Sequence, residues 1–134
     1  MKKIGTLNSQ LSQVIASMGH SDRLVVCDSG LPIPRGEEVV DLALTAGIPR
    51  FLDTLRVILE ELQVEKAIIA DEMESRNPTV YREVMSLLKK VEIARVSHEE
   101  FKELTHGGGN ISFVRTGEAT PFANVILISG VTFN

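Results

Sequence analysis

The residues best suited to chemistry in this sequence are His20 and Asp28. An imidazole titrates near neutral pH, so it can both donate and accept a proton without extreme tuning. His20 follows the predicted end of a helix, and Asp28 ends the strand that comes next. We expect that strand to run back past the helix and bring the two side chains together, so that the carboxylate orients the imidazole or holds a ligand hydroxyl. The structural alternative is that His20 caps the helix and Asp28 begins a turn.

Two further segments carry side chains that suit a small polar ligand. His98 lies just inside the predicted start of a helix, with Lys102 one turn later on the same face, where both can present donors to a ligand. Between two apolar strands near the C-terminus, Phe122 can pack on the apolar face of a sugar. Asn124 there offers a donor and an acceptor to a pair of hydroxyls. The structural alternatives are an exposed helix start and a hairpin connection.

Motifs for cofactor or metal chemistry are missing from the sequence. There is no glycine-rich phosphate loop, and the HGGG at 106–109 has no G-x-S-x-G nucleophile to serve. The three histidines and one cysteine lack the spacing of zinc ligands. Cys27 lies in an apolar run and is predicted to be a core residue. The sequence therefore predicts acid–base chemistry with no metal and no cofactor.

Composition limits the partners of this chain. The net charge is −4, no lysine or arginine cluster can track a phosphate backbone, and a single tyrosine with no tryptophan gives no base-stacking platform. The N-terminal MKKIGTLNSQL lacks the apolar stretch of a secretory signal, and the longest apolar runs fall short of the ~20 residues that span a bilayer. We expect a cytoplasmic protein that binds neither nucleic acid nor membrane.

Hydrophobic periodicity predicts the elements that position these residues. Recurrence of apolar residues every three to four positions predicts helices over 9–18, 50–62, 78–90 and 97–104. Asn77 is the predicted cap of the third helix, and Ser97 forms a capping box with Glu100 at the fourth. Short apolar runs predict buried strands over 24–27, 39–44, 66–70, 93–96, 111–115 and 124–131.

Strands that alternate with helices at this spacing predict an α/β fold: a single three-layer α/β/α domain over residues 1–134 with a mostly parallel sheet. Ligands of such sheets bind at the ends of strands, where loops meet helix termini. The segments of interest are therefore 28–34, 71–75, 97–102 and 115–124. We expect residues 71–75 to be a polar rim.

Several segments carry a resemblance to a known family. They are LNSQLSQVIASMGHSD (7–22), LVVCDSGLPIP (24–34), SHEEFK (97–102) and RTGEATPFANVIL (115–127). In this order they cover nearly the whole chain, which resembles the family of ribose pyranases and fucose mutarotases. DLALTAGIPRF (41–51) and VEKAIIADE (64–72) are more similar to its ribose branch.

This resemblance implies an isomerase that interconverts the pyranose and furanose forms of free D-ribose, without metal or cofactor, for ribose catabolism. It implies that His20 is the proton donor and that the sugar is bound by Asp28, His98, Phe122, Ala123 and Asn124, with Lys102 as a further candidate. It also implies a homo-oligomer, typically a homodecamer, whose active sites lie at subunit interfaces, with the C-terminal binding segment opposite the His20 of a neighbour.

The sequence departs from the family at two places. Phe122 stands where the family usually has tyrosine, and the loop over 106–110 is slightly longer than usual. Three alternatives remain: a non-catalytic pentose-binding accessory protein of sugar uptake, a fucose-type mutarotase that exchanges anomers, and a generic α/β regulatory module.

Overall fold

The chain contains six strands and five helices, and the computed structural model describes all 134 residues. The helices are α1 (Ser9–Ser17), α2 (Phe51–Glu61), α3 (Glu72–Arg76), α4 (Pro78–Leu87) and α5 (His98–Thr105). The strands are β1 (Arg23–Cys27), β2 (Glu38–Asp41), β3 (Val64–Ala70), β4 (Glu92–Val96), β5 (Ile111–Arg115) and β6 (Val125–Ser129). None of the helices has the length and apolar character needed to cross a membrane.

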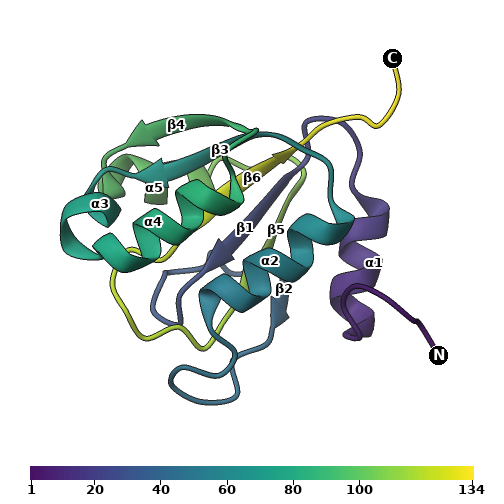
Figure 1. Ribbon diagram of the computed structural model, residues 1–134, viewed down its shortest axis with the longest axis horizontal. Helices are drawn as coiled ribbons and strands as arrows, with labels where there is room; N and C mark the ends of the chain where they lie inside the picture. Colours follow the sequence, from purple (N-terminus) through teal and green to yellow (C-terminus); the bar gives the residue numbers. More distant parts are fainter.

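The strands form one sheet in the order β2-β5-β1-β6-β3-β4. The pairs β2–β5, β5–β1 and β3–β4 are parallel. Strand β6 lies between β1 and β3 and is antiparallel to both. The predicted mostly parallel sheet is therefore confirmed, with β6 as its one reversed strand (Figure 1).

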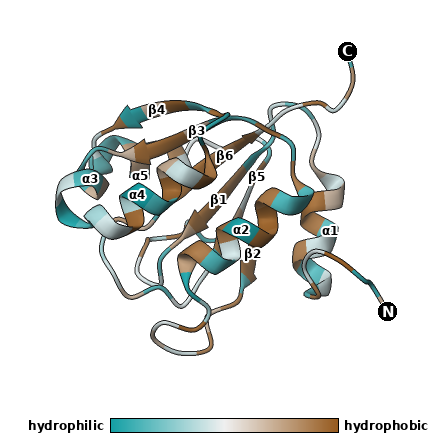
Figure 2. Cartoon of the chain, in the orientation of Figure 1, coloured by the Kyte–Doolittle hydropathy of each residue, from teal (hydrophilic) through white to brown (hydrophobic).

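Two apolar cores lie on opposite faces of this sheet. The larger contains residues of α1, α2 and α4, and the smaller is built around Phe101 of α5. Figure 2 shows the apolar residues concentrated on the strands between these layers. Residues 24–27 of β1 are wholly buried because helices cover both faces of the sheet there. This burial explains why the strand is apolar throughout. Burial also raises the pKa of the Cys27 thiol to about 12, and confirms this cysteine as a core residue.

Three local predictions were wrong. Residues 72–76 form the short helix α3 where a polar rim was expected, and β2 ends at Asp41 although the apolar pattern continues to Leu44. The side chain of Asn77 does not cap α4. Its amide instead donates hydrogen bonds to the Thr120 hydroxyl (2.9 Å) and the Pro121 carbonyl (2.8 Å). Asn77 therefore holds a distant loop.

That loop, residues 116–124, joins β5 to β6 and is not a hairpin. Strands β5 and β6 flank β1 on its two sides, so the connection must cross the carboxyl end of β1. The backbone N–H of Thr116 donates to the Cys27 carbonyl at 3.0 Å, and that of Ser29 donates to the Glu118 carbonyl at 2.9 Å. The crossing brings the loop against the first residues after β1.

Candidate active site

Asp28 is the first residue beyond β1, and Asn124 fixes it in place. The Asn124 amide oxygen accepts from the Asp28 backbone N–H at 2.9 Å, and its amide nitrogen donates to Asp28 Oδ2 at 3.2 Å. The other carboxylate oxygen accepts from the backbone N–H of Gly30 at 2.9 Å. The carboxylate thus has one orientation, because each of its oxygens has a fixed partner.

Partial burial governs the electrostatics of Asp28. Desolvation raises the pKa of its carboxyl group above the ordinary value of 3.8, while the hydrogen bonds from Gly30 and Asn124 and the nearby imidazole of His98 oppose the rise. A carboxylate held in a partly dry site forms stronger hydrogen bonds with a ligand hydroxyl than one in water does. Asp28 is therefore suited to bind a polar ligand.

His98, the first residue of α5, lies beside the ring of Phe122. The two rings meet edge to face, with centroids 5.0 Å apart and planes at 84°. The His98 backbone N–H donates to both carboxylate oxygens of Glu72, at 3.0 and 3.2 Å, so α3 fixes the start of α5. The Nδ1 atom of His98 is buried and has no hydrogen-bond partner. A buried polar atom without a partner marks a place where a ligand group can bind.

These side chains line one cavity of about 250 Å³, formed by Asp28, Gly30, Leu31, Pro32, His98, Pro121 and Phe122. It is smaller than the ~300–1,000 Å³ of sites for drug-sized ligands. A carboxylate, an imidazole and an aromatic ring face the same space, so the cavity combines hydrogen-bonding groups with an apolar surface. This combination fits a molecule with hydroxyl groups on one side and C–H groups on the other, such as a monosaccharide.

A buried hydrogen-bond network supports the loop that carries Phe122. The carboxylate of Glu118 accepts from the Phe51 backbone N–H at 3.0 Å and from the Thr120 hydroxyl at 2.7 Å. Asn77 holds Thr120 from the other side. Phe122 itself has a positive φ of 60°, which is uncommon for a residue with a bulky side chain. The network holds this strained residue with its ring against His98.

His20 lies far from this cavity, and the prediction that His20 approaches Asp28 within one chain is wrong. The residue is in the turn before β1, whereas Asp28 follows the same strand. The five residues of β1 separate them by about 16 Å, at ~3.3 Å per residue. The side chain of His20 is 54% exposed, and its Nε2 lies 3.2 Å from Oε2 of Glu65. Within one chain, the imidazole therefore pairs with Glu65.

The remaining predicted site residues do not line the cavity with their side chains. Ala123 is fully buried and packs in the larger core. Asn124 is 1% exposed and acts through Asp28. The ammonium group of Lys102 pairs with Glu99 at 2.8 Å. The structure thus brings Asp28, His98 and Phe122 together, with Asn124 behind them.

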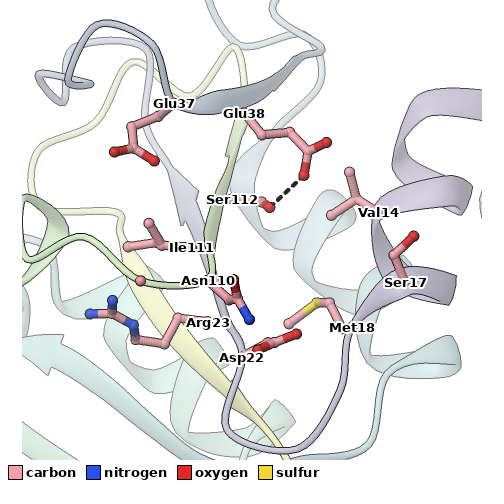
Figure 3. A pocket seen from close by; sticks show the side chains of 11 residues that line it. Val14, Ser17, Met18, Asp22, Arg23, Glu37, Glu38, Asn110, Ile111 and Ser112 are labelled. Carbon is pink, nitrogen blue, oxygen red and sulfur yellow. Dashed lines mark hydrogen bonds between the residues drawn. The ribbon is translucent and has the colours of Figure 1, made fainter.

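A larger cavity of about 420 Å³ opens between α1 and the starts of β1 and β5 (Figure 3). Carboxylates of Asp22, Glu37 and Glu38 border it, and the Ser112 hydroxyl donates to Glu38 at 2.7 Å. Its lining has no histidine, so it offers no side chain that ordinarily titrates near neutral pH. Of these two cavities, the smaller one, which contains His98, is therefore the candidate active site.

Sequence reasoning missed the residues that support the site: Glu65, Glu72, Asn77 and Glu118. Each is a polar residue whose partner is more than 20 positions away, so no local pattern reveals the contact. Glu65 gave only a weak signal, because it and Lys66 are two adjacent charged residues near the start of an otherwise apolar strand. No group of three or more histidine, cysteine or acidic side chains is arranged to hold a metal ion.

Comparison with known proteins shows relatives that are similar to this chain over nearly its full length. It is 58% identical to a D-ribose pyranase of Coprothermobacter proteolyticus over 99% of this chain and all of that protein. The structure of Bacillus subtilis RbsD complexed with D-ribose is 46% identical and superposes with a TM-score of 0.92, over 99% of this chain and all of that one. A fucose mutarotase of Streptococcus pneumoniae in complex with L-fucose is 20% identical with a TM-score of 0.82, over the same shares, and shares the fold. Residues 1–132 match the RbsD / FucU transport protein family, and the chain belongs to that family.

Proposed function

We propose that this protein is an isomerase that interconverts the β-pyranose and β-furanose forms of free D-ribose. The observation that carries the proposal is the cavity in which Asp28, His98 and Phe122 face one another. Similarity over the full chain to proteins named D-ribose pyranase, and to a structure that contains D-ribose, supports ribose as the ligand. The low identity to the fucose mutarotase supports the ribose branch over the fucose branch.

In this proposal the cavity residues hold the sugar. Asp28 accepts hydrogen bonds from sugar hydroxyls, the unpartnered Nδ1 of His98 gains a partner from the sugar, and Phe122 packs on its C–H face. Asn124 contributes by fixing Asp28, and Ala123 can contribute only through its backbone, because its side chain is buried. Lys102 would reach the sugar only by leaving Glu99.

The reaction needs proton transfers alone. A proton delivered to the ring oxygen and one removed from the anomeric hydroxyl break the C1–O bond of the pyranose and form the open-chain aldehyde. Rotation of the chain then lets the C4 hydroxyl attack the aldehyde, with both proton transfers reversed, and this closes the furanose. Such acid–base assistance contributes ~10²–10⁴-fold in rate. His20 is the proposed donor of the first proton.

Because His20 lies at the opposite end of β1 from the cavity, the proposal requires the His20 of a neighbouring subunit. Apolar side chains that a monomer would leave in water support an oligomer: Ile4, Leu7, Leu44, Ile48 and Phe133 are all more than half exposed. Apolar side chains that gather in one exposed patch mark protein contacts, and in this proposal the subunit interface covers them. A head-to-tail interface whose rotation closes forms a ring, and in such a ring every cavity receives one imidazole. We propose a homodecamer with its active sites at subunit interfaces.

The proposed cellular role is to supply the ring form of ribose that a catabolic enzyme accepts, in the cytoplasm. The functional test is NMR exchange spectroscopy on D-ribose at equilibrium, with L-fucose as the comparison sugar. We expect faster pyranose–furanose exchange of ribose with the wild type and with His106→Ala, a matched control at an exposed histidine, and background exchange with His20→Ala. Ribose binding without faster exchange would contradict the proposal and favour an accessory protein, whereas anomer exchange of fucose alone would favour a fucose-type mutarotase.

A further inference from the structure

We propose that Glu65 is the positioning residue of His20: its carboxylate accepts a hydrogen bond from Nε2 and leaves Nδ1 to exchange the proton with the sugar. This inference rests on the proposed function. Glu65 is the second residue of β3, which is separated from β1 by β6 in the sheet. The contact between Nε2 and Glu65 Oε2, at 3.2 Å, is the one hydrogen bond of the His20 ring within the chain.

The chemistry of the two groups fixes the direction of this hydrogen bond. An ionised carboxylate only accepts, so Nε2 of the imidazole must carry a proton and donate it. The neutral ring then has its lone pair on Nδ1. Glu65 therefore selects one tautomer of His20 and one reactive nitrogen, which is the role that the sequence had suggested for Asp28.

The surroundings of Glu65 keep its carboxylate within reach of His20. Gly130 lies against it: a Cβ atom at position 130 would lie 3.1 Å from the Glu65 Cβ and 3.6 Å from Oε2. The Gly130 N–H donates to the Gln63 carbonyl at 2.8 Å, which holds this segment beside β3. The absence of a side chain at Gly130 thus leaves room for the Glu65 side chain at its Cβ.

The backbone of His20 is held as firmly. The Asp22 N–H donates to the Gly19 carbonyl at 3.2 Å, closing a tight turn around His20, and the Asp22 carboxylate accepts from the Gly19 N–H at 2.8 Å. The Ser21 N–H donates to the Ser129 carbonyl at 2.9 Å, next to Gly130. The turn fixes the backbone position of His20, and Glu65 fixes the orientation of its imidazole ring.

In the reaction, the imidazolium form of His20 would donate its Nδ1 proton to the ring oxygen of the sugar while Nε2–H remains with Glu65. On ring closure, Nδ1 would take back one proton from the C4 hydroxyl, so the histidine ends as it began. Glu65 touches no sugar atom in this scheme and is a positioning residue. Both side chains are about half exposed, at 54% and 48%, and pairs this exposed contribute little to stability. Loss of Glu65 should leave the fold intact.

The test compares Glu65→Ala, Glu65→Gln and the matched control Glu60→Ala, which removes an exposed carboxylate from α2. Two kinds of measurement are made on the full-length protein: the kinetics of ribose exchange, which give kcat and KM, and the ¹⁵N chemical shifts of the His20 ring, which report its tautomer. For Glu65→Ala we expect kcat to fall about tenfold or more, a part of the ~10²–10⁴-fold that acid–base catalysis contributes, with unchanged KM and mixed tautomers. Glu65→Gln keeps an oxygen acceptor, so it should retain most of the wild-type kcat and most of the wild-type tautomer of His20. Glu60→Ala should match the wild type in both.

An unchanged kcat in Glu65→Ala would overturn the inference, and so would a lower kcat with an unchanged tautomer. Gly130→Ala provides an independent variant, because the added methyl group would lie 3.1 Å from the Glu65 Cβ, displace that side chain and shift the tautomer in the same direction as Glu65→Ala. His20→Ala distinguishes a failure of the catalytic role of His20 from a failure of the positioning role of Glu65. If it retains the wild-type rate, the assignment of His20 in the proposed function fails. If it loses the rate while Glu65→Ala does not, only the role of Glu65 fails.

Discussion

Asn124 and Asp28, 96 positions apart in the sequence, are joined by two hydrogen bonds. The amide oxygen of Asn124 accepts from the Asp28 backbone and its amide nitrogen donates to the Asp28 carboxylate. Asp28 follows β1 and Asn124 precedes β6, which is the antiparallel neighbour of β1. The reversed strand therefore brings the end of one segment and the start of the other to the same point, and the cavity forms there.

Asn124→Ala should weaken both the fold and the site. The change leaves the Asp28 backbone N–H without its partner, and an unsatisfied buried donor costs ~1–3 kcal/mol. We expect the free energy of unfolding to fall by about that amount in urea titrations and ribose binding to be lost in NMR titrations. Asn110→Ala, at an exposed position, is the control and should match the wild type. Wild-type stability and binding in Asn124→Ala would contradict the role assigned here.

Asp28→Asn should change how stability depends on pH. Burial raises the pKa of Asp28 above the ordinary 3.8, so the folded state holds this proton more tightly than the unfolded state. The stability that protonated Asp28 contributes is therefore present at low pH and is lost as pH rises through the raised pKa. Asparagine does not titrate, so the stability of the variant relative to the wild type should increase across that interval and stay constant above it. Urea titrations at several pH values measure the difference, and a decrease across the interval would contradict the raised pKa.

Ser21→Gly should stabilise the turn that carries His20. Ser21 has a φ of 74°, a left-handed conformation that costs a side-chain-bearing residue ~1–3 kcal/mol. Glycine removes this strain, although its greater freedom in the unfolded chain returns ~0.5–1 kcal/mol. We expect a net gain of about 1 kcal/mol, seen as a higher Tm. Ser21→Ala keeps the strain and is the control without gain, and a lower Tm in Ser21→Gly would contradict the reasoning.

Phe122→Tyr should strengthen ribose binding. Phe122 stands where resemblance to the family leads us to expect tyrosine, and its ring lines the cavity beside His98. One added hydrogen bond contributes about 1 kcal/mol, which corresponds to roughly fivefold in KM. The exchange assay measures KM directly. Phe133→Tyr, at the exposed C-terminus, is the control. Phe101→Tyr cannot serve because Phe101 is fully buried in the core. An unchanged KM in Phe122→Tyr would show that the hydroxyl finds no partner.

The elements were predictable from the sequence because their signals are local. Periodicity located α1, α2 and α5 to within about two residues, and the apolar run of β1 marked a strand buried on both faces. Asp28, His98 and Phe122 were also identified as candidates, and the structure brings these three together.

The remaining features depend on how distant segments meet. The sequence pattern does not say that β6 is inserted antiparallel between β1 and β3, so the segment over 115–124 was compatible with a hairpin. His20 and Asp28 are close in sequence, but the strand between them holds them apart. Glu65 lies on β3 and meets His20 across β6, with Gly130 packed against its Cβ. Such contacts follow from the tertiary arrangement, which has no local signature.

A site shared between neighbouring subunits can be tested by activity complementation between two inactive variants, His20→Ala and Asp28→Asn. Each alone should give background ribose exchange by NMR. If every site combines His20 of one subunit with the cavity of its neighbour, mixed oligomers assembled from equal amounts should recover about a quarter of the wild-type rate, because one interface in four pairs two intact halves. Mixed oligomers that stay at background would contradict a site shared between subunits.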